Sequence, residues 1–463
     1  MPAKYHIETA PVAGNFRRVG KYGSIDARED CSRCSNCVKP RCAYDTYRKE
    51  AAHNRDPAAP IQPLYECRAC LSCVQGCTKG LLRIALNPEY LAMGNETWKP
   101  DVIAATWKQA DTGRIPVSGA GYRGSFHGPG FDSIWTDMSE IVRPTRDGIH
   151  GREYISTSVD LGPKPMRLAF SPSGSLLTEV GDLIELPIPV MLDCPGWTMG
   201  GRSIDAVRAR AARKLGTLAI VPARYVRDAA ESELPHLAAL LDPDQPRPER
   251  LRNVRLVEIP DRAGALPLAR QILASESPPV VALRLPLARS STDGLMECVE
   301  AGIRVFHLSA DMHGREIGAP RPKHLRDSLR DIHRQLVRHG IRDEITLIVS
   351  GGIALAEHVA KAIICGADLV AVDTALLVAL GCRVCPGVTS HDQACPAEPG
   401  PDNPGHAAGR IVNLMAAWHS QLIEVLGAMG IREVRRLRGE LGRAIFREDI
   451  EREAFGDLIR GRA

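Results

Sequence analysis

Eight cysteines lie within the first 80 residues of this chain, in two short runs. The first run carries Cys31, Cys34, Cys37 and Cys42, and the second carries Cys67, Cys70, Cys73 and Cys77. Thiolates at such short intervals can bind one metal centre together. The sequence shows neither a signal peptide nor an apolar segment of membrane-spanning length. We therefore expect a cytoplasmic chain whose cysteines bind metal rather than form disulfides.

The second run has the spacing C-x2-C-x2-C-x3-C of bacterial ferredoxins, and the first differs by one extra residue before its fourth cysteine. In two-cluster ferredoxins the fourth cysteine of each run binds the other cluster. We therefore predict two [4Fe–4S] clusters, one held by Cys31, Cys34, Cys37 and Cys77 and one by Cys67, Cys70, Cys73 and Cys42. Two zinc sites are the alternative, but zinc does not require a third cysteine at the same interval. Residues 1–90 are expected to form a ferredoxin-like domain that conducts electrons.

Residues 91–165 are expected to form a loop-rich connecting segment. The sequence pattern changes after it. From residue 166 to about 400, short apolar strands alternate with helical segments, and residues 401–463 form a helical tail. We expect strands at 187–192, 217–222, 254–259, 279–285, 303–309, 345–352 and 369–374, and helices at 203–215, 323–340, 355–366 and 408–430. This alternation predicts an α/β fold with a parallel sheet. A TIM-type (β/α)8 barrel is the first choice. An open doubly wound sheet is the alternative, because only seven strands are evident.

Ligands of such barrels bind at the carboxyl ends of the strands, often with a phosphate near the last two loops. Those loops contain Ser350, Gly351, Gly352, Asp373 and Thr374. Glycines let backbone N–H groups approach a phosphate, although a simple strand-to-helix turn would explain them too. A phosphate-bearing redox cofactor beside iron–sulfur clusters suggests FMN, which converts between one- and two-electron steps. Arg284 could stabilise a reduced flavin, or it could be an ordinary surface arginine.

Three segments resemble the flavin-binding domain of glutamate synthase large subunits: residues 133–162, the Ser-Gly-Gly turn and residues 371–385. The likeness is greatest to the stand-alone archaeal and bacterial type, in which a ferredoxin-like segment precedes the barrel. It covers residues 20–455. The resemblance implies a barrel that carries FMN and reduces 2-iminoglutarate, formed from 2-oxoglutarate and ammonia, to glutamate.

The resemblance also implies roles for individual residues. Thr198, Met199 and Gly200 stand where the family contacts the flavin, and Arg284 stands where it usually has a lysine. A third cluster, [3Fe–4S], would be held by Cys382, Cys385 and Cys395, although their spacing differs from that of the family. Reduced structural cysteines are the alternative for these three.

The chain departs from the family at residues 310–320, where a glycine-rich segment is missing. His313 and Arg315 are the polar candidates left there, the former as a proton donor or a solvated loop residue, the latter as a clasp for a substrate carboxylate. A related enzyme with another substrate, of the N-methylglutamate synthase type, therefore stays open. A non-catalytic electron-transfer subunit is a further alternative.

Other chains are expected to complete the reaction. Met1 is followed by Pro2 rather than by the family's glutaminase cysteine, and no NAD(P)-binding βαβ unit is evident. Ammonia would come from solution or a separate glutaminase, and electrons from ferredoxin or an electron-donor subunit. A net charge of +4 and an aromatic content of 5% argue against nucleic-acid or membrane partners.

Overall fold

The computed structural model describes residues 5–460 except 17, 29, 32–37, 44–69, 116–129, 137–154, 166, 179–180, 182, 194–201, 245–250, 252, 291 and 386–402. Seven predicted site residues lie outside the described residues: Cys34, Cys37, Cys67, Thr198, Met199, Gly200 and Cys395.

Eight parallel strands close into a barrel, in which each strand pairs with the next along the chain and the last pairs with the first. The strands are β6 (Val190–Leu192), β7 (Ala219–Pro222), β8 (Leu237–Leu240), β9 (Leu256–Pro260), β10 (Val280–Pro286), β11 (Val305–Ser309), β12 (Thr346–Ser350) and β13 (Leu369–Val372). Every residue of β12 and β13 is buried, as expected for strands covered on both sides. The predicted barrel is confirmed, and the open sheet is excluded.

The eighth strand, β8, was missing from the sequence prediction. Its sequence, Leu-Ala-Ala-Leu, contains no β-branched or aromatic residue, and leucine and alanine favour helices. Pairing with both neighbours makes it a strand: Ala219 of β7 pairs with Leu237, and Ala238 pairs with Leu256 of β9.

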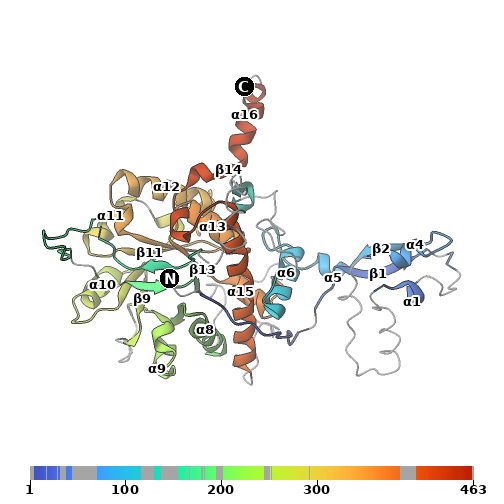
Figure 1. The fold of residues 1–463 in the computed structure, drawn as a ribbon, viewed down its shortest axis with the longest axis horizontal. Coiled ribbons are helices and arrows are strands. Elements are labelled where there is room, and N and C mark those ends of the chain that lie inside the picture. The colour runs from blue at the N-terminus through green and yellow to red at the C-terminus, as the bar shows by residue number, and fades with distance from the viewer. Residues whose placement is uncertain are drawn as a thin grey trace.

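Helices cover the outside of the barrel (Figure 1). They are α8 (Arg202–Leu215), α9 (Ala223–Asp228), α10 (Ala265–Leu273), α11 (Thr292–Glu300), α12 (Leu325–Arg338), α13 (Ala356–Ile364), α14 (Thr374–Ala379) and α15 (Pro404–Ala428). Helix α15 packs against α8 and α13, so it closes the ring of helices after the last strand. None of the described helices is both long and apolar enough to cross a membrane.

Helix α6 (Pro100–Thr112) lies within the stretch that was expected to be rich in loops. Its side chains Ile103 and Trp107 are fully buried, and the helix packs against α15. The sequence does carry a helix signal here, because Pro100 occupies the first turn and Gly113 follows the end with φ of 66°.

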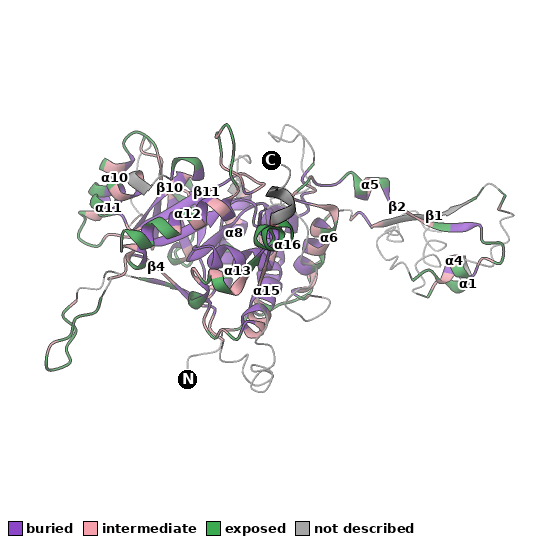
Figure 2. Ribbon diagram, turned by 90° about the horizontal axis from the view of Figure 1, so that it is seen from above, coloured by how far each residue is buried: buried purple, intermediate pink, exposed green. Residues whose placement is uncertain are grey.

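A small unit extends to one side of the barrel (Figures 1 and 2). Strands β1 (Tyr22–Ala27) and β2 (Leu82–Leu86) pair antiparallel there, and α1 (Val38–Arg41) packs against α4 (Ser72–Gln75). Helix α5 (Pro88–Leu91) follows β2. The described cysteines of the two runs lie between these strands in the sequence.

The remaining elements lie around the barrel. Two further antiparallel pairs are β3 (Ile134–Thr136) with β14 (Ala444–Phe446) and β4 (Val159–Leu161) with β5 (Ile184–Leu186). Helix α16 (Arg447–Arg460) projects from the molecule (Figure 1). Short 3-10 helices are η1 (Gly130–Ser133), η3 (Leu234–His236), η5 (Leu287–Arg289), η6 (Arg342–Glu344), η7 (Val434–Leu437) and η8 (Leu441–Arg443).

Candidate active site

Four ionisable side chains lie in the barrel towards the carboxyl ends of its strands. Asp193 follows β6, Glu258 is in β9, Arg284 is in β10 and His307 is in β11. Glu258 and His307 are 0% exposed, and Arg284 is 19% exposed. Apolar branched residues usually fill the interior of such barrels. A buried charged group in this position is therefore a candidate for function.

The four side chains form one continuous chain of contacts. Arg284 Nη2 donates to Asp193 Oδ2, and Arg284 Nη1 lies 3.5 Å from both Asp193 Oδ1 and Glu258 Oε1. His307 Nδ1 lies 2.5 Å from the same Glu258 oxygen. Burial by itself would raise the pKa of Asp193, but the charge of Arg284 outweighs it and holds that pKa below its usual range. Asp193 is therefore ionised and anchors the guanidinium.

Two atoms of this network lack partners in the described part of the chain. Glu258 Oε2 and His307 Nε2 are buried and make no hydrogen bond there. A buried polar atom without a partner costs about 1–3 kcal/mol. Such atoms are uncommon in stable cores, and here both belong to the hydrogen-bonded pair of His307 and Glu258.

Asp373 and Thr374 lie at the end of β13, as the prediction placed them. Asp373 caps α14 by accepting a hydrogen bond from the Thr374 N–H. Burial raises the pKa of Asp373 to about 6, and the negative charge of Asp193 adds to the increase. Thr374 Oγ1 is buried without a hydrogen-bond partner among the described residues. This end of the barrel therefore has a hydroxyl group without a hydrogen-bond partner among the described residues. It lies next to the carboxyl group of Asp373, whose pKa is about 6.

The Ser350-Gly351-Gly352 turn packs against the loop that follows β11. Gly351 has φ of 96° and Gly352 has φ of 68°. A Cβ atom on Gly351 would lie 2.5 Å from the Ala310 carbonyl oxygen, and one on Gly352 would lie 2.6 Å from Gly314 Cα. Packing therefore requires both glycines, whether or not their N–H groups also meet a phosphate.

His313 and Arg315 are held by the segment that leads into the barrel from the N-terminal unit. His313 Nδ1 lies 2.9 Å from Thr97 Oγ1, and Arg315 Nη2 lies 3.2 Å from Glu96 Oε1. The His313 ring is thus hydrogen-bonded within this loop, and its role as a proton donor stays a prediction. Arg315 is 41% exposed and could still exchange its partner for a ligand.

Cys382 and Cys385 lie after α14, on a segment that touches the N-terminal unit. Cys382 is buried and its Sγ accepts a hydrogen bond of 3.4 Å from Val384 N, whereas Cys385 is exposed. Between them, Arg383 forms a 2.8 Å ion pair with Glu89 of α5. This contact connects the region after the last barrel strand to the helix that follows β2.

None of the described cysteines of the two N-terminal runs forms a disulfide bond in the described part of the chain. Cys42 follows the end of α1, and Cys73 lies within α4. Cys77 Sγ accepts a 3.4 Å hydrogen bond from Leu81 N, and backbone donors of this kind lower the pKa of Cys77. A side-chain hydrogen bond with Ser72 likewise lowers the pKa of Cys70. These are environments that favour the thiolate, the form that binds metal.

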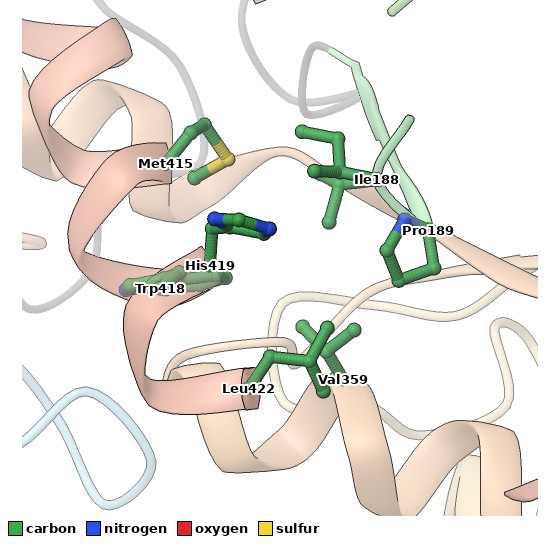
Figure 3. Close-up of a pocket in the computed structure, with 8 residues that line it drawn as sticks. Ile188, Pro189, Val359, Met415, Trp418, His419 and Leu422 are labelled. Carbon is green, nitrogen blue, oxygen red and sulfur yellow. The ribbon is translucent and has the colours of Figure 1, made fainter. Parts of the chain in front are cut away.

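One polar cluster and one hollow elsewhere in the described chain are weaker candidates for a catalytic centre. Asp132, Glu357 and His358 come together, but His358 Nε2 is 3.0 Å from Asp132 and its Nδ1 accepts from Ala354 N, so both ring nitrogens already have partners. A hollow beside the start of β6 is almost entirely apolar (Figure 3). Its histidine, His419, is hydrogen-bonded to Thr157, and burial lowers its pKa to about 4. Neither place is a convincing catalytic centre.

Comparison with known proteins agrees with the resemblance seen in the sequence. Residues 318–432 match the sequence family described as "Conserved region in glutamate synthase". An archaeal-type glutamate synthase [NADPH] of Dehalococcoides mccartyi is 25% identical over 90% of this chain and 93% of its own length. An archaeal glutamate synthase [NADPH] of Archaeoglobus fulgidus is 26% identical over 93% of this chain and 96% of its own. These matches support a glutamate synthase large-subunit-like family for this chain.

This glutamate synthase-like protein is thus an oxidoreductase. A flavocytochrome b2 variant with benzoylformate overlays with a TM-score of 0.39 at 12% identity, over 68% of this chain and 87% of that one, which is too slight a likeness to add to the assignment.

The sequence analysis named Arg284, Asp373 and Thr374, which lie towards the carboxyl ends of the barrel strands, but it did not name Asp193, Glu258 and His307. A signal was present for two of the three, because Glu258 and His307 each interrupt an otherwise apolar strand. A charged residue in a strand buried on both faces needs a partner inside the barrel. Only the register of the strands shows which partner that is.

Proposed function

We propose that this chain is an iron–sulfur flavoprotein that passes electrons from two N-terminal [4Fe–4S] clusters to FMN in the barrel. The electrons would then reduce an imine such as 2-iminoglutarate, which yields glutamate. The observation that carries the proposal is the Glu89–Arg383 ion pair of 2.8 Å, which connects the cysteine-rich unit to the segment with Cys382 and Cys385. A [3Fe–4S] cluster on Cys382, Cys385 and Cys395 would lie on this route.

One observation of the structure supports FMN binding at the carboxyl ends of the strands. The buried hydroxyl of Thr374 has no hydrogen-bond partner in the described chain, so it can accept or donate to a bound group. Ser350, Gly351, Gly352, Asp373 and Thr374 would hold the phosphate, and Thr198, Met199 and Gly200 would contact the ring. When bound, FMN would supply the conversion between one- and two-electron transfer.

Residues of the barrel interior would provide the charge that this chemistry needs. Arg284 is a permanent cation, and its contacts with Asp193 and Glu258 fix its position. A fixed positive charge near a reduced flavin would stabilise the anionic form. The hydrogen bond between His307 Nδ1 and Glu258 Oε1 is held away from solvent, because both side chains are fully buried.

We propose 2-oxoglutarate and ammonia as the substrates, because the chain is similar to archaeal-type glutamate synthases. Ammonia would come from solution or a separate glutaminase. Ferredoxin or another electron-donor protein would supply the electrons.

One observation favours a second candidate, a related enzyme that uses another amine, such as an N-methylglutamate synthase. The loop at 310–320 differs from the family, and its polar residues His313 and Arg315 are held by Thr97 and Glu96. A substrate-binding loop organised in this way is expected to recognise a different imine.

An anaerobic assay separates the two candidates. Purified protein with reduced ferredoxin and 2-oxoglutarate receives either ammonium or methylamine, and the amino acid formed is measured. Glutamate from ammonium supports the first candidate, and N-methylglutamate from methylamine supports the second. Neither product, from protein with full flavin content, would contradict both substrates. The matched control is Arg284→Met, which should form less product with either amine.

A further inference from the structure

A hollow opens at the amino-terminal end of the barrel, and its volume of about 540 Å3 includes space that is open to solvent. Its charged lining residues are Asp160, Lys164, Asp368, Arg435 and Arg438. Asp368 comes directly before β13, so the hollow lies at the opposite ends of the strands from the proposed active site. The proposed catalytic chemistry makes no use of these residues.

The carboxylate of Asp368 is already fully engaged. Its Oδ2 accepts hydrogen bonds of 2.8 Å from Arg342 Nη2 and from Leu347 N. Its Oδ1 accepts one of 2.8 Å from Arg438 Nη1. Lys164 Nζ is 3.8 Å from the same Oδ1, which is beyond hydrogen-bonding distance.

The ammonium group of Lys164 can therefore still donate a hydrogen bond to a ligand. Its side chain is only 21% exposed, and no hydrogen bond from its Nζ is present within the described residues. Burial and the neighbouring Arg438 lower the pKa of Lys164, while Asp368 opposes them. A largely buried ammonium group without a hydrogen-bond acceptor is costly unless something satisfies it.

The hollow as a whole has an excess of positive charge. Three cations line it, Lys164, Arg435 and Arg438, against the two carboxylates of Asp160 and Asp368. The second carboxylate is also engaged, because Asp160 Oδ2 lies 2.5 Å from Arg435 Nη1. The space between these groups is open to a ligand rather than filled by the chain.

We propose that this hollow binds a small anion that carries a carboxylate or a phosphate group. Lys164 Nζ donates to an oxygen of the anion, and the guanidinium groups of Arg435 and Arg438 lie beside it. Arginine suits both chemistries because its planar fork matches the oxygens of either group. The site is independent of the proposed flavin chemistry at the other end of the barrel.

Thermal unfolding and calorimetric titration of the full chain with its cofactors test the proposal. Phosphate and citrate are added separately at constant ionic strength, with chloride as the baseline. We expect a saturable rise in Tm, because an anion that binds only the folded state stabilises it by mass action. A response to phosphate alone would identify a phosphate ligand, and a response to citrate alone a carboxylate. Responses to both would identify the oxyanion chemistry they share.

Variants locate the binding. Lys164→Gln should remove the saturable rise, whereas Lys214→Gln, on the exposed side of α8, should keep it. Arg435→Gln is the second variant, since the side chain of Arg435 is 46% exposed. It should weaken binding about tenfold, the usual effect of losing one charge-assisted hydrogen bond. No saturable rise with either anion, or the same rise in Lys164→Gln as in the natural chain, would overturn the proposal.

Discussion

At the scale of single residues, the barrel interior shows how a charged group can be stable in an apolar fold. Asp193 and Arg284 neutralise each other, and Glu258 contacts both Arg284 and His307. Each side chain would be costly by itself, so the four depend on one another. Their energies should therefore not add when they are changed together.

Replacing Arg284 tests this dependence. Arg284→Met should lower the free energy of unfolding by about 3 kcal/mol, because it leaves the buried Asp193 carboxylate without its cation. Asp193→Asn should also destabilise. The double variant should lose clearly less than the sum of the two single losses, as measured by denaturant unfolding. Strictly additive losses would show that the two side chains do not interact.

The raised pKa of Asp373 predicts that the stability of the folded chain depends on pH. Its pKa is raised to about 6 in the folded chain, above the ordinary value of 3.8, so folding favours the protonated form. The ionised carboxylate therefore costs stability above pH 6, and this cost disappears as the pH falls from 6 towards 4. Asp373→Asn should stabilise the protein by up to about 3 kcal/mol at pH 8, and by progressively less down to pH 4.5.

The measurement is the difference in unfolding free energy between the natural chain and the variant across this range. Asp244→Asn, a change at an exposed aspartate, is the matched control. A stabilisation by Asp373→Asn that grew as the pH fell would contradict the assignment.

At the scale of elements, the loops at the carboxyl ends of the strands pack closely on one another. The turn after β12 lies against the loop after β11, at the approach of Gly352 to Gly314. The segment before α6 holds that same loop through Thr97 and His313. The loop at residues 310–320 is therefore held by its surroundings on two sides.

Two glycines allow the energetic cost of backbone strain to be measured apart from the cost of a steric clash. Gly352 and Gly318 both have positive φ, of 68° and 77°. A Cβ on Gly352 would meet the backbone of Gly314 at 2.6 Å, whereas one on Gly318 would meet nothing within 4 Å. Gly318→Ala should cost about 1 kcal/mol from strain alone, and Gly352→Ala about 3 kcal/mol in denaturant unfolding. Equal losses would mean that the turn moves away freely.

At the scale of the whole molecule, a barrel and a cysteine-bearing unit are connected through a short segment. Helix α5 follows β2, and its Glu89 reaches Arg383 beyond the last strand of the barrel. The unit projects to the side in both views (Figures 1 and 2). The proposed electron route therefore depends on a contact between parts of the chain almost 300 residues apart.

Iron content tests the proposed clusters. Anaerobically purified protein should hold about eleven irons per chain, of which about eight belong to the two N-terminal clusters. Cys382→Ser should lower the content by about three and leave the flavin in place. Cys365→Ser is the matched control, since burial raises the pKa of Cys365 to about 12 and makes it a packing residue. Equal iron in all three proteins would contradict the third cluster.

The sequence by itself determined the class of fold, the cysteine pattern and the approximate positions of seven of the eight barrel strands. Those features depend on local composition and spacing, such as the apolar runs that became β10 and β12. Only the tertiary structure decided that Leu237–Leu240 is a strand, since its residues favour a helix and its neighbours impose the pairing. Only the tertiary structure decided that Glu258 and His307 are partners. The register of the strands brings them within hydrogen-bonding distance, and no single segment of the sequence encodes that register.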